Sequence, residues 1–437
     1  MLNLNLDFKK YYKILETTEP ILVKGKVSKV VGLTIEGTGI KAAVGDVCKI
    51  RADGHEIQAE VIGFKENSLI LMPFGEIQGV LPGSEILHVG KRATIGVSQK
   101  MLGRIINALG EPIDSQGPLP VEDEYYLYAL PSNPLSRVPI DTPLDVGIRA
   151  INGLLTLGKG QRVGIFAGSG IGKTTLLGMM VRYAKADVKV IALIGERGRE
   201  VRDFVEKHVK DALGQTILVV ATSDQPPLLR MRGAFVATAI AEFFRDQGKD
   251  VLLIMDSLTR FAMAQRELGL SAGEPPTTKG YTPSVFALLP KLLERAGKWK
   301  NGSITALYTV LVEGDDMNDP IADASRAILD GHIVLSRDIA RQNQYPPIDV
   351  LSSVSRVMYD VTSKEHVNLS SQFKELLATY KEAEDMINIG AYVKGSNPQI
   401  DRALRLIDQM RSYLKQDIEE SASLELSIKQ LAQILKP

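Results

Sequence analysis

Cysteine is nearly absent from this sequence, since Cys48 is the only one among 437 residues. No intrachain disulfide can form, and no set of thiolates is available to hold zinc. Disulfide-stabilised scaffolds and zinc–thiolate modules are therefore excluded. This usage of cysteine favours a reducing compartment. Histidine is also scarce, and its five copies are scattered without the spacing of metal ligands.

Long hydrophobic runs and an excess of charge of either sign are missing too. No run approaches the roughly 20 apolar residues of a membrane span, and the start, MLNLNLDFKKYYKIL, lacks the basic-then-apolar plan of a signal peptide. Lys and Arg number 52, as do Asp and Glu, so the formal net charge is zero. A general nucleic-acid binder would carry a basic excess. We expect a cytoplasmic protein that does not act on nucleic acid.

The chain is long enough for two or three domains and begins with a segment of its own, residues 1–20. Leu4, Phe8, Tyr11 and Leu15 recur there at three- and four-residue spacing with lysines between them, which predicts a short amphipathic helix. Such a helix packs on its own domain, or it binds a partner or a membrane surface. The sequence leaves these alternatives open.

Three patterns follow this segment. Residues 21–91 hold short β-rich stretches between glycine and polar turns, which predicts a small antiparallel β-barrel. Residues 92–360 alternate Val/Ile/Leu-rich runs with helical patterns, which predicts an α/β domain with a mostly parallel sheet covered on both faces. These runs are QRVGIFA, VKVIALIGE, TILVVATSD, DVLLIMD, GSITALYTVLVE and GHIVLS. Residues 361–437 keep helical spacing, which predicts a C-terminal helical domain.

The most informative stretch is GIFAGSGIGKTTLLGMM, residues 164–180, which nearly matches the phosphate-loop signature G-x-x-x-x-G-K-[ST]. Ala167 replaces the first glycine, and alanine fits if that position needs no positive φ. The loop follows a strand-like run and opens a helical pattern, so its backbone N–H groups can surround an anion. The predicted ATP-binding residues are Gly168, Ser169, Gly170, Ile171, Gly172, Lys173, Thr174 and Thr175.

Two other strand ends supply carboxylates. Asp256 ends the run DVLLIMD, and ligands of parallel sheets bind at such ends, so Asp256 and Thr174 are the predicted Mg²⁺ ligands. Glu196 and Arg197 follow another strand in IALIGERGREV. A glutamate there can polarise the water that attacks the γ-phosphorus, and the arginine can hold the developing charge. The sequence therefore predicts an ATP-hydrolysing site with Lys173, Glu196 and Arg197 as catalytic residues.

These stretches closely resemble the type III protein-export ATPases over about residues 20–400, and most of all the bacterial flagellar export branch. Further stretches that carry the resemblance are LIGERGREVRDF, GEPPTTKGYTPSVFALLPKLLERAG, EGDDMNDPIADASRAILDGHIVLSR and VLSSVSRVM. The virulence-secretion (injectisome) ATPases are the alternative. The family is similar in turn to the catalytic subunits of F- and V-type rotary ATPases. The resemblance implies a RecA-like P-loop core between an N-terminal β-barrel and a C-terminal helical domain.

The resemblance also implies a homohexamer that hydrolyses ATP at the inner-membrane export apparatus, helps to unfold and deliver export substrates, and releases their chaperones. It implies a stator-like regulator at the N-terminal segment, a coiled-coil stalk and a membrane export gate as partners. By matching motifs, Tyr345 packs against adenine, and Arg356 is an arginine finger that reaches the neighbouring subunit's site. The residues alone favour a turn aromatic at Tyr345 and, at Arg356, a structural arginine paired with a carboxylate.

Three other functions share parts of this pattern. A non-catalytic, nucleotide-binding ring subunit would carry glutamine in place of Glu196. The catalytic subunit of a rotary ATP synthase would carry an acidic D-E-L-S-E-E-D-type segment, where this chain has KEAEDMINIGAYVKGSNPQ. A Rho-like RNA translocase would interleave aromatic and basic residues in its barrel, which residues 21–91 do not. The export ATPase is the favoured interpretation.

Overall fold

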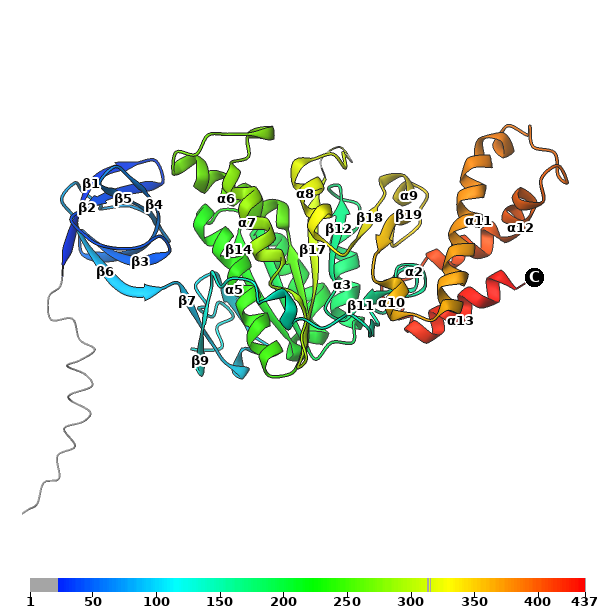
Figure 1. Ribbon diagram of the computed structural model, residues 1–437, viewed down its shortest axis with the longest axis horizontal. Coiled ribbons are helices and arrows are strands. Elements are labelled where there is room, and N and C mark those ends of the chain that lie inside the picture. The colour runs from blue at the N-terminus through cyan, green and yellow to red at the C-terminus, as the bar shows by residue number, and fades with distance from the viewer. Residues whose placement is uncertain (1–22, 313, 315, 437) are drawn as a thin grey trace, which may run out of the picture. The chain divides into compact units, whose positions relative to one another are not determined.

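The computed structural model describes residues 23–312, 314 and 316–436, so the predicted amphipathic segment at 1–20 lies outside the described residues (Figure 1). The chain divides into two compact units, one that runs to Ala93 and includes residues 271–273, and one that holds the remainder. Each is described by itself. Among the described helices, none has both the length and the apolar character that crossing a membrane requires.

The first unit contains a closed antiparallel barrel with the strand order β1-β2-β5-β4-β3-β6. Alternate side chains fill its interior, because successive strand residues point to opposite faces. Cys48 and Ile50 on β3 are fully buried, and burial raises the pKa of the Cys48 thiol to about 11, which makes it an inert core residue. The strands are β1 Lys24–Val31, β2 Thr34–Thr38, β3 Asp46–Ala52, β4 His55–Lys65, β5 Ser68–Pro73 and β6 Glu85–Arg92. The predicted antiparallel barrel is confirmed.

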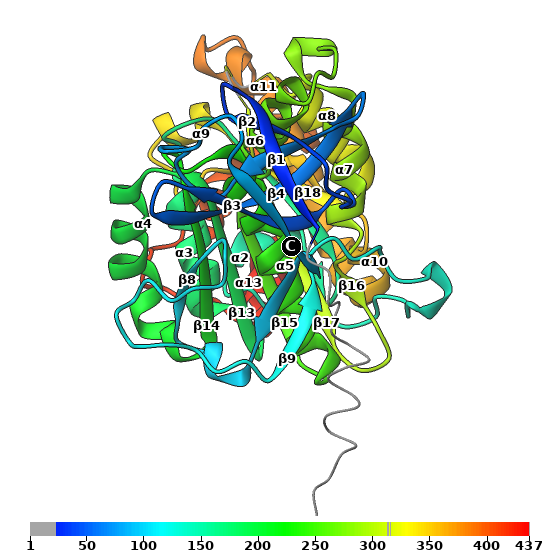
Figure 2. The same cartoon turned by 90° about the vertical axis from the view of Figure 1, so that its left-hand side faces the viewer.

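The second unit is built on a sheet with the order β19-β18-β12-β17-β15-β13-β14-β8, and Figure 2 shows β14, β13, β15 and β17 side by side in that sheet. These strands pair in parallel, except that β19 is antiparallel to β18 and β16 is antiparallel to β17. The bounds are β8 Ile105–Asn107, β12 Arg162–Ala167, β13 Val188–Glu196, β14 Thr216–Thr222, β15 Asp250–Asp256, β16 Gly297–Lys298, β17 Ser303–Leu311, β18 Gly331–Leu335 and β19 Ile348–Ser355.

Consecutive residues of β13 and β15 are buried, so both faces of the sheet are covered, as predicted. Helix α5 packs on β13, β14 and β15, and α8 packs on β12 and β17. The helices that precede the C-terminal ones are α2 Arg149–Leu154, α3 Lys173–Tyr183, α4 Gly198–Phe204, α5 Pro227–Asp246, α6 Leu258–Ser271, α7 Pro283–Leu293, α8 Pro320–Ile328, α9 Arg337–Arg341 and α10 Met358–Val361. Short strand pairs, β7 Thr94–Val97 with β9 Asp123–Tyr126 and β10 Pro143–Leu144 with β11 Leu157–Gly158, complete the unit. The predicted α/β fold is confirmed.

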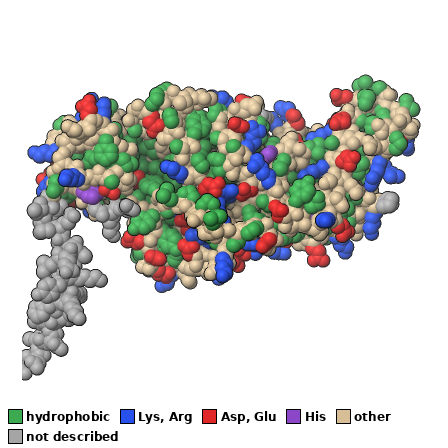
Figure 3. Space-filling view, in the orientation of Figure 1, with side chains coloured by type: hydrophobic (Ala, Val, Ile, Leu, Met, Phe, Trp, Pro, Cys, Tyr) green, Lys and Arg blue, Asp and Glu red, His purple; other side chains and the backbone are tan. Residues whose placement is uncertain are grey.

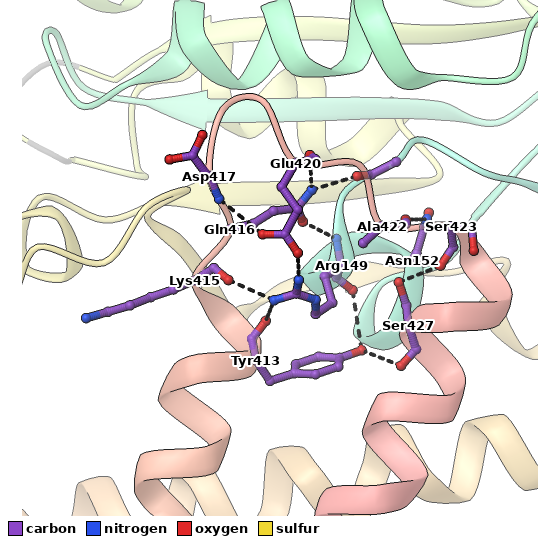
Figure 4. Close-up of polar contacts among 11 residues, drawn as sticks. Arg149, Asn152, Tyr413, Lys415, Gln416, Asp417, Glu420, Ala422, Ser423 and Ser427 are labelled. Atoms are coloured by element: carbon purple, nitrogen blue, oxygen red, sulfur yellow. Dashed lines mark hydrogen bonds and ion pairs between the residues drawn. The ribbon is translucent and has the colours of Figure 1, made fainter.

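The C-terminal helices are α11 Lys364–Asn388, α12 Pro398–Leu414 and α13 Leu424–Leu435. The connection between α12 and α13 is attached to α2 by buried polar contacts around Arg149 (Figure 4). The Arg149 guanidinium donates to the Lys415 carbonyl at 2.9 Å and pairs with Glu420. The Gln416 side chain accepts from the Arg149 backbone N–H at 2.7 Å, and Asn152 donates to the Ala422 carbonyl at 2.9 Å. Because buried polar groups need partners, these bonds hold the connection in one place.

The face of the molecule drawn in Figure 3 shows acidic and basic side chains interspersed over the second unit. Mixed charges of this kind agree with the balanced composition of the chain.

Candidate active site

The loop of residues 168–172 joins β12 to α3 at the carboxyl end of the sheet. Gly170 and Gly172 have φ values of 76° and 91°, a left-handed backbone that glycine adopts without steric cost. Ala167 is the last residue of β12 and keeps the extended backbone of the strand. Alanine at the first position of the signature therefore carries no conformational penalty. The loop leaves the N–H groups at the start of α3 available for an anion.

Lys173, Glu196 and Asp256 come from three segments and meet beside this loop. The Lys173 Nζ donates to Asp256 Oδ1 at 2.5 Å and lies 4.0 Å from Glu196 Oε1. The side chains of Lys173 and Asp256 are only 11% and 6% exposed. Strand register brings the two carboxylates together, because Asp256 on β15 pairs with Leu193 on β13, and Glu196 is the last residue of β13. Thr309 on β17 fixes the carboxylate by donating to Asp256 Oδ1 at 2.7 Å.

The electrostatics of Glu196 suit a base. Burial and the neighbouring Asp256 carboxylate raise the pKa of Glu196 to about 7, and the Lys173 ammonium partly opposes this shift. A carboxyl group with a pKa near neutrality holds and releases a proton at physiological pH more readily than an ordinary glutamate does. The arrangement can therefore accept a proton from a water molecule beside the loop.

A cavity of about 520 Å³ is lined by Lys173 and Glu196. Its walls include the loop glycines, Thr174, Glu196 and Arg197. The Arg197 guanidinium is 81% exposed and lies 3.3 Å from the Glu200 carboxylate. A triphosphate placed in this cavity would lie between the loop and a glutamate that can act on water.

The cavity also contains Arg260, which the sequence reasoning missed. Arg260 lies in the first turn of α6, and its side chain covers Gly195, where a Cβ would approach the Arg260 Cβ to 2.8 Å. A cation beside a phosphate site stabilises negative charge. The signal that could have found it is its position one helical turn after the strand-end carboxylate of Asp256.

The remaining loop residues face different surroundings. The Ile171 side chain is 2% exposed and belongs to the core, so its backbone alone can face a ligand. Thr174 and Thr175 line a second cavity, of about 230 Å³, together with Glu196 and Asp256. Within the described part of the chain, no group of three or more His, Cys, Asp or Glu could hold a metal by itself. Mg²⁺ in nucleotide sites takes one or two protein oxygens and completes its shell with phosphate and water.

The structure brings Tyr345 to the loop. A Cβ built at Gly172 would lie 3.8 Å from the Tyr345 ring, which is 48% exposed. The Tyr345 carbonyl accepts a hydrogen bond from the Gln416 backbone N–H at 2.9 Å, so the connection between α12 and α13 also contacts this residue. The ring is available to stack on a base next to the phosphate loop.

Arg356 does not reach the cavity of its own subunit. It follows β19, whose last residue, Ser355, pairs with Gly331 at the amino end of β18. The phosphate loop lies at the carboxyl end of the neighbouring strand β12. The exposed Arg356 guanidinium donates to the Arg326 carbonyl at 3.4 Å, and no described carboxylate forms an ion pair with it. The structural alternative, an ion pair with a carboxylate, has no support among the described residues.

The β-barrel domain of the ATP synthase alpha/beta family matches residues 27–90, and the nucleotide-binding domain of that family matches residues 147–355. The C-terminal domain described as that of the T3SS EscN ATPase matches residues 362–433. These matches cover the barrel, the sheet with its phosphate loop, and the C-terminal helices.

Full-length relatives show the same similarity. The "Flagellum-specific ATP synthase" of Bacillus subtilis (strain 168) is 52% identical over 428 residues, which are 96% of this chain and 97% of that protein. The "Type 3 secretion system ATPase" of Xanthomonas euvesicatoria is 47% identical over 413 residues, 94% of this chain and 93% of that protein.

Solved structures of the assembled ATPase EscN, from the type III secretion system of enteropathogenic E. coli, also resemble this chain. One has a TM-score of 0.90 at 46% identity and covers 94% of this chain and 100% of its own. A second, in which EscN is in complex with its central stalk EscO, has a TM-score of 0.88 at the same identity and coverage.

Proposed function

The chain belongs to the ATP synthase alpha/beta family, in the branch of flagellar and type III secretion ATPases, and it is an ATPase; we propose that it drives flagellar protein export as a ring motor that hydrolyses Mg-ATP. The observation that carries this proposal is that Lys173 contacts both Asp256 and Glu196 beside a phosphate loop, and that Lys173 and Glu196 line the cavity in front of that loop. The injectisome ATPase is the second candidate, favoured by the similarity to EscN.

The phosphate groups of ATP would bind to the loop of residues 168–172, whose N–H groups lie at the N-terminus of α3. Lys173 exchanges its bond with Asp256 for the β- and γ-phosphate oxygens, which match its charge. Thr174 and Asp256 line one cavity and supply the hydroxyl and carboxylate oxygens that Mg²⁺ prefers, so they fit the ion. When bound, the ion would offset the phosphate charge.

Glu196 then accepts a proton from the attacking water while the water oxygen bonds to the γ-phosphorus and the bond to the ADP oxygen breaks. Arg197 at the cavity rim stabilises the charge that develops on the γ-phosphate oxygens. Tyr345 stacks on the adenine. Arg356 completes the neighbouring subunit's site as an arginine finger, an interpretation supported by its exposure and its distance in the fold from its own loop.

These roles require a closed ring of identical subunits, because each site takes its finger from the next subunit, and we propose that the ring is a homohexamer. The assembled state of the similar EscN, and its complex with a central stalk, support a ring and a coiled-coil stalk partner here. The remaining proposed partners are a stator-like regulator at the N-terminal segment, the membrane export gate, and export substrates with their chaperones. The ring would sit on the cytoplasmic side of the inner-membrane export apparatus.

The test is Glu196→Gln, which keeps the size and polarity of the side chain but removes its basicity. ATP affinity measured by calorimetry should stay near that of the wild type, while kcat falls on the order of 10²–10⁴-fold. Glu206→Gln is the matched control, because Glu206 is an exposed glutamate that pairs with Arg202 and lines neither cavity. Near-normal turnover by Glu196→Gln would refute the assignment of the base.

A further inference from the structure

Arg356 presents an exposed guanidinium on a fixed backbone. Its N–H donates to the Asp330 carbonyl at 3.0 Å, and its guanidinium donates to the Arg326 carbonyl at 3.4 Å. The preceding residue, Ser355, is 8% exposed, and its hydroxyl donates to the Thr156 carbonyl at 2.8 Å. These hydrogen bonds of the backbone and of the buried Ser355 therefore fix the position from which the Arg356 side chain extends into solvent.

The buried side-chain amide of Gln161 contacts the two residues that hold the Arg356 backbone, Asp330 and Ser355. Gln161 is fully buried, and its Nε2 donates to the Asp330 carbonyl at 3.1 Å and to the Ser355 hydroxyl at 3.2 Å. Its Oε1 accepts from the Gly158 N–H at 2.9 Å, which fixes the orientation of the amide. Gly331 leaves room for this contact, because a Cβ there would lie 3.2 Å from the Gln161 Nε2 and 2.5 Å from the Val354 carbonyl.

Arg162, the residue after Gln161, also binds Asp330. The Arg162 backbone N–H and Nε donate to Asp330 Oδ2 at 3.0 and 2.9 Å, and its Nη2 donates to Oδ1 at 2.9 Å. A bidentate, charge-assisted pair of this kind restricts both partners to one geometry. Gln161 and Arg162 stand at the amino end of β12, and the phosphate loop follows the carboxyl end of the same strand.

We propose that Gln161 is a positioning residue for Arg356: through Asp330 and Ser355 it aligns the arginine that completes the neighbouring subunit's site. The inference rests on the proposed function of Arg356. A catalytic group stabilises the transition state only when it is correctly placed, and a displacement of about 1 Å can cost on the order of 10²-fold in rate. Gln161 thus contributes to catalysis in the next subunit, although it lies in the core of its own.

The first measurement uses Gln161→Met, which keeps the length of the side chain but removes the amide. In assembled rings kcat should fall about 10- to 100-fold, while the KM for ATP stays within about twofold, because the loop and Tyr345 are unchanged. Ser355→Ala is the second variant, because it removes one bond of Gln161 and keeps its other two. Its kcat should fall in the same direction by a smaller factor.

Mixed rings separate a role in the neighbour from a role in the subunit itself. Gln161→Met subunits keep an intact base, and Glu196→Gln subunits keep a correctly placed finger. In rings from equal amounts of both, about a quarter of the sites combine an intact base with an intact finger from the neighbour. Turnover should therefore rise well above that of either variant alone. Lys173→Ala with Glu196→Gln is the control and should show no recovery, because both variants are defective in their own sites.

Arg356→Ala with Glu196→Gln distinguishes this inference from the function on which it rests. If that mixture recovers and the Gln161→Met mixture does not, Gln161 supports only its own subunit's site, and the inference fails. The inference fails as well if Gln161→Met rings turn over ATP like the wild type. If the Arg356→Ala mixture stays inactive although mixed rings form, the finger function of Arg356 itself is refuted.

Discussion

Replacing Gln416 with alanine should loosen the C-terminal helices and weaken ATP binding together. The Gln416 side chain is 6% exposed and makes three hydrogen bonds, from the Arg149 N–H at 2.7 Å and to the Gly147 and Glu420 carbonyls at 2.8 Å each. Its backbone N–H also donates to the Tyr345 carbonyl at 2.9 Å. The residue therefore joins the connection between α12 and α13 to both α2 and the proposed adenine contact.

The magnitude follows from the groups that the substitution leaves behind. The Arg149 N–H opens α2 and loses its acceptor, and an unpaired buried donor costs about 1–3 kcal/mol. The two bonds that the amide donates contribute about 0.5–1.5 kcal/mol each, so the loss totals about 2–6 kcal/mol. The Gly147 carbonyl still accepts from the Ala422 N–H at 3.0 Å, which favours the lower half of that range.

Urea titration followed by limited proteolysis would measure the loss, because the C-terminal helices should open before the sheet does. The KM for ATP should rise about three- to tenfold with kcat nearly unchanged, since Tyr345 acts in binding rather than in the chemical step. Gln399→Ala is the matched control, because Gln399 is an exposed glutamine of α12 whose replacement should change stability by less than about 0.5 kcal/mol.

The reasoning is refuted if Gln416→Ala opens at the same urea concentration as the Gln399 control. An unchanged opening together with a raised KM would also contradict it, because the predicted displacement of Tyr345 depends on loosening of the connection.

Two further predictions concern Ala167 in the phosphate-loop signature and the dependence of stability on pH. Ala167→Gly restores the full signature but should leave kcat and KM unchanged, and it should lower stability by about 0.5–1 kcal/mol in a urea titration, because glycine weakens a strand. Burial lowers the pKa of His366, whose Nε2 donates to the Gly153 carbonyl at 2.8 Å, below its ordinary 6.5. The unfolded chain therefore binds the proton more readily, so stability should fall as the pH drops below about 6.5. His366→Gln should flatten this pH dependence between pH 7.5 and 5.5, and an unchanged slope would contradict the assignment.

Much of the fold and part of the site could be predicted from local patterns. The glycines before Lys173 and the apolar runs that end at Glu196 and Asp256 can be recognised within a few residues. A left-handed backbone favours glycine, and burial of a strand on both faces of a sheet requires apolar side chains. The interior strands of the sheet were found in this way. The edge strands β8 and β19 were not among the six strand-like runs predicted for residues 92–360, since short or half-exposed strands carry weaker patterns.

The residues that act through distant partners could not be predicted in this manner. Arg260 enters the cavity only because α6 packs over Gly195, and Gln416 contacts Tyr345 only because α12 and α13 dock on α2. Nothing in the neighbouring sequence of Gln161 indicates that its amide reaches Asp330 and Ser355.

Local sequence patterns are sufficient to predict the phosphate loop and the two strand-end carboxylates, because each of these depends on interactions within a short segment. Only the tertiary structure shows that Lys173 contacts both Asp256 and Glu196. It also shows that Arg356 is outside the cavity of its own subunit, next to Ser355 and Asp330, which Gln161 binds. The physical reason is that strand register and packing bring together residues whose separation along the chain carries no record of their contact.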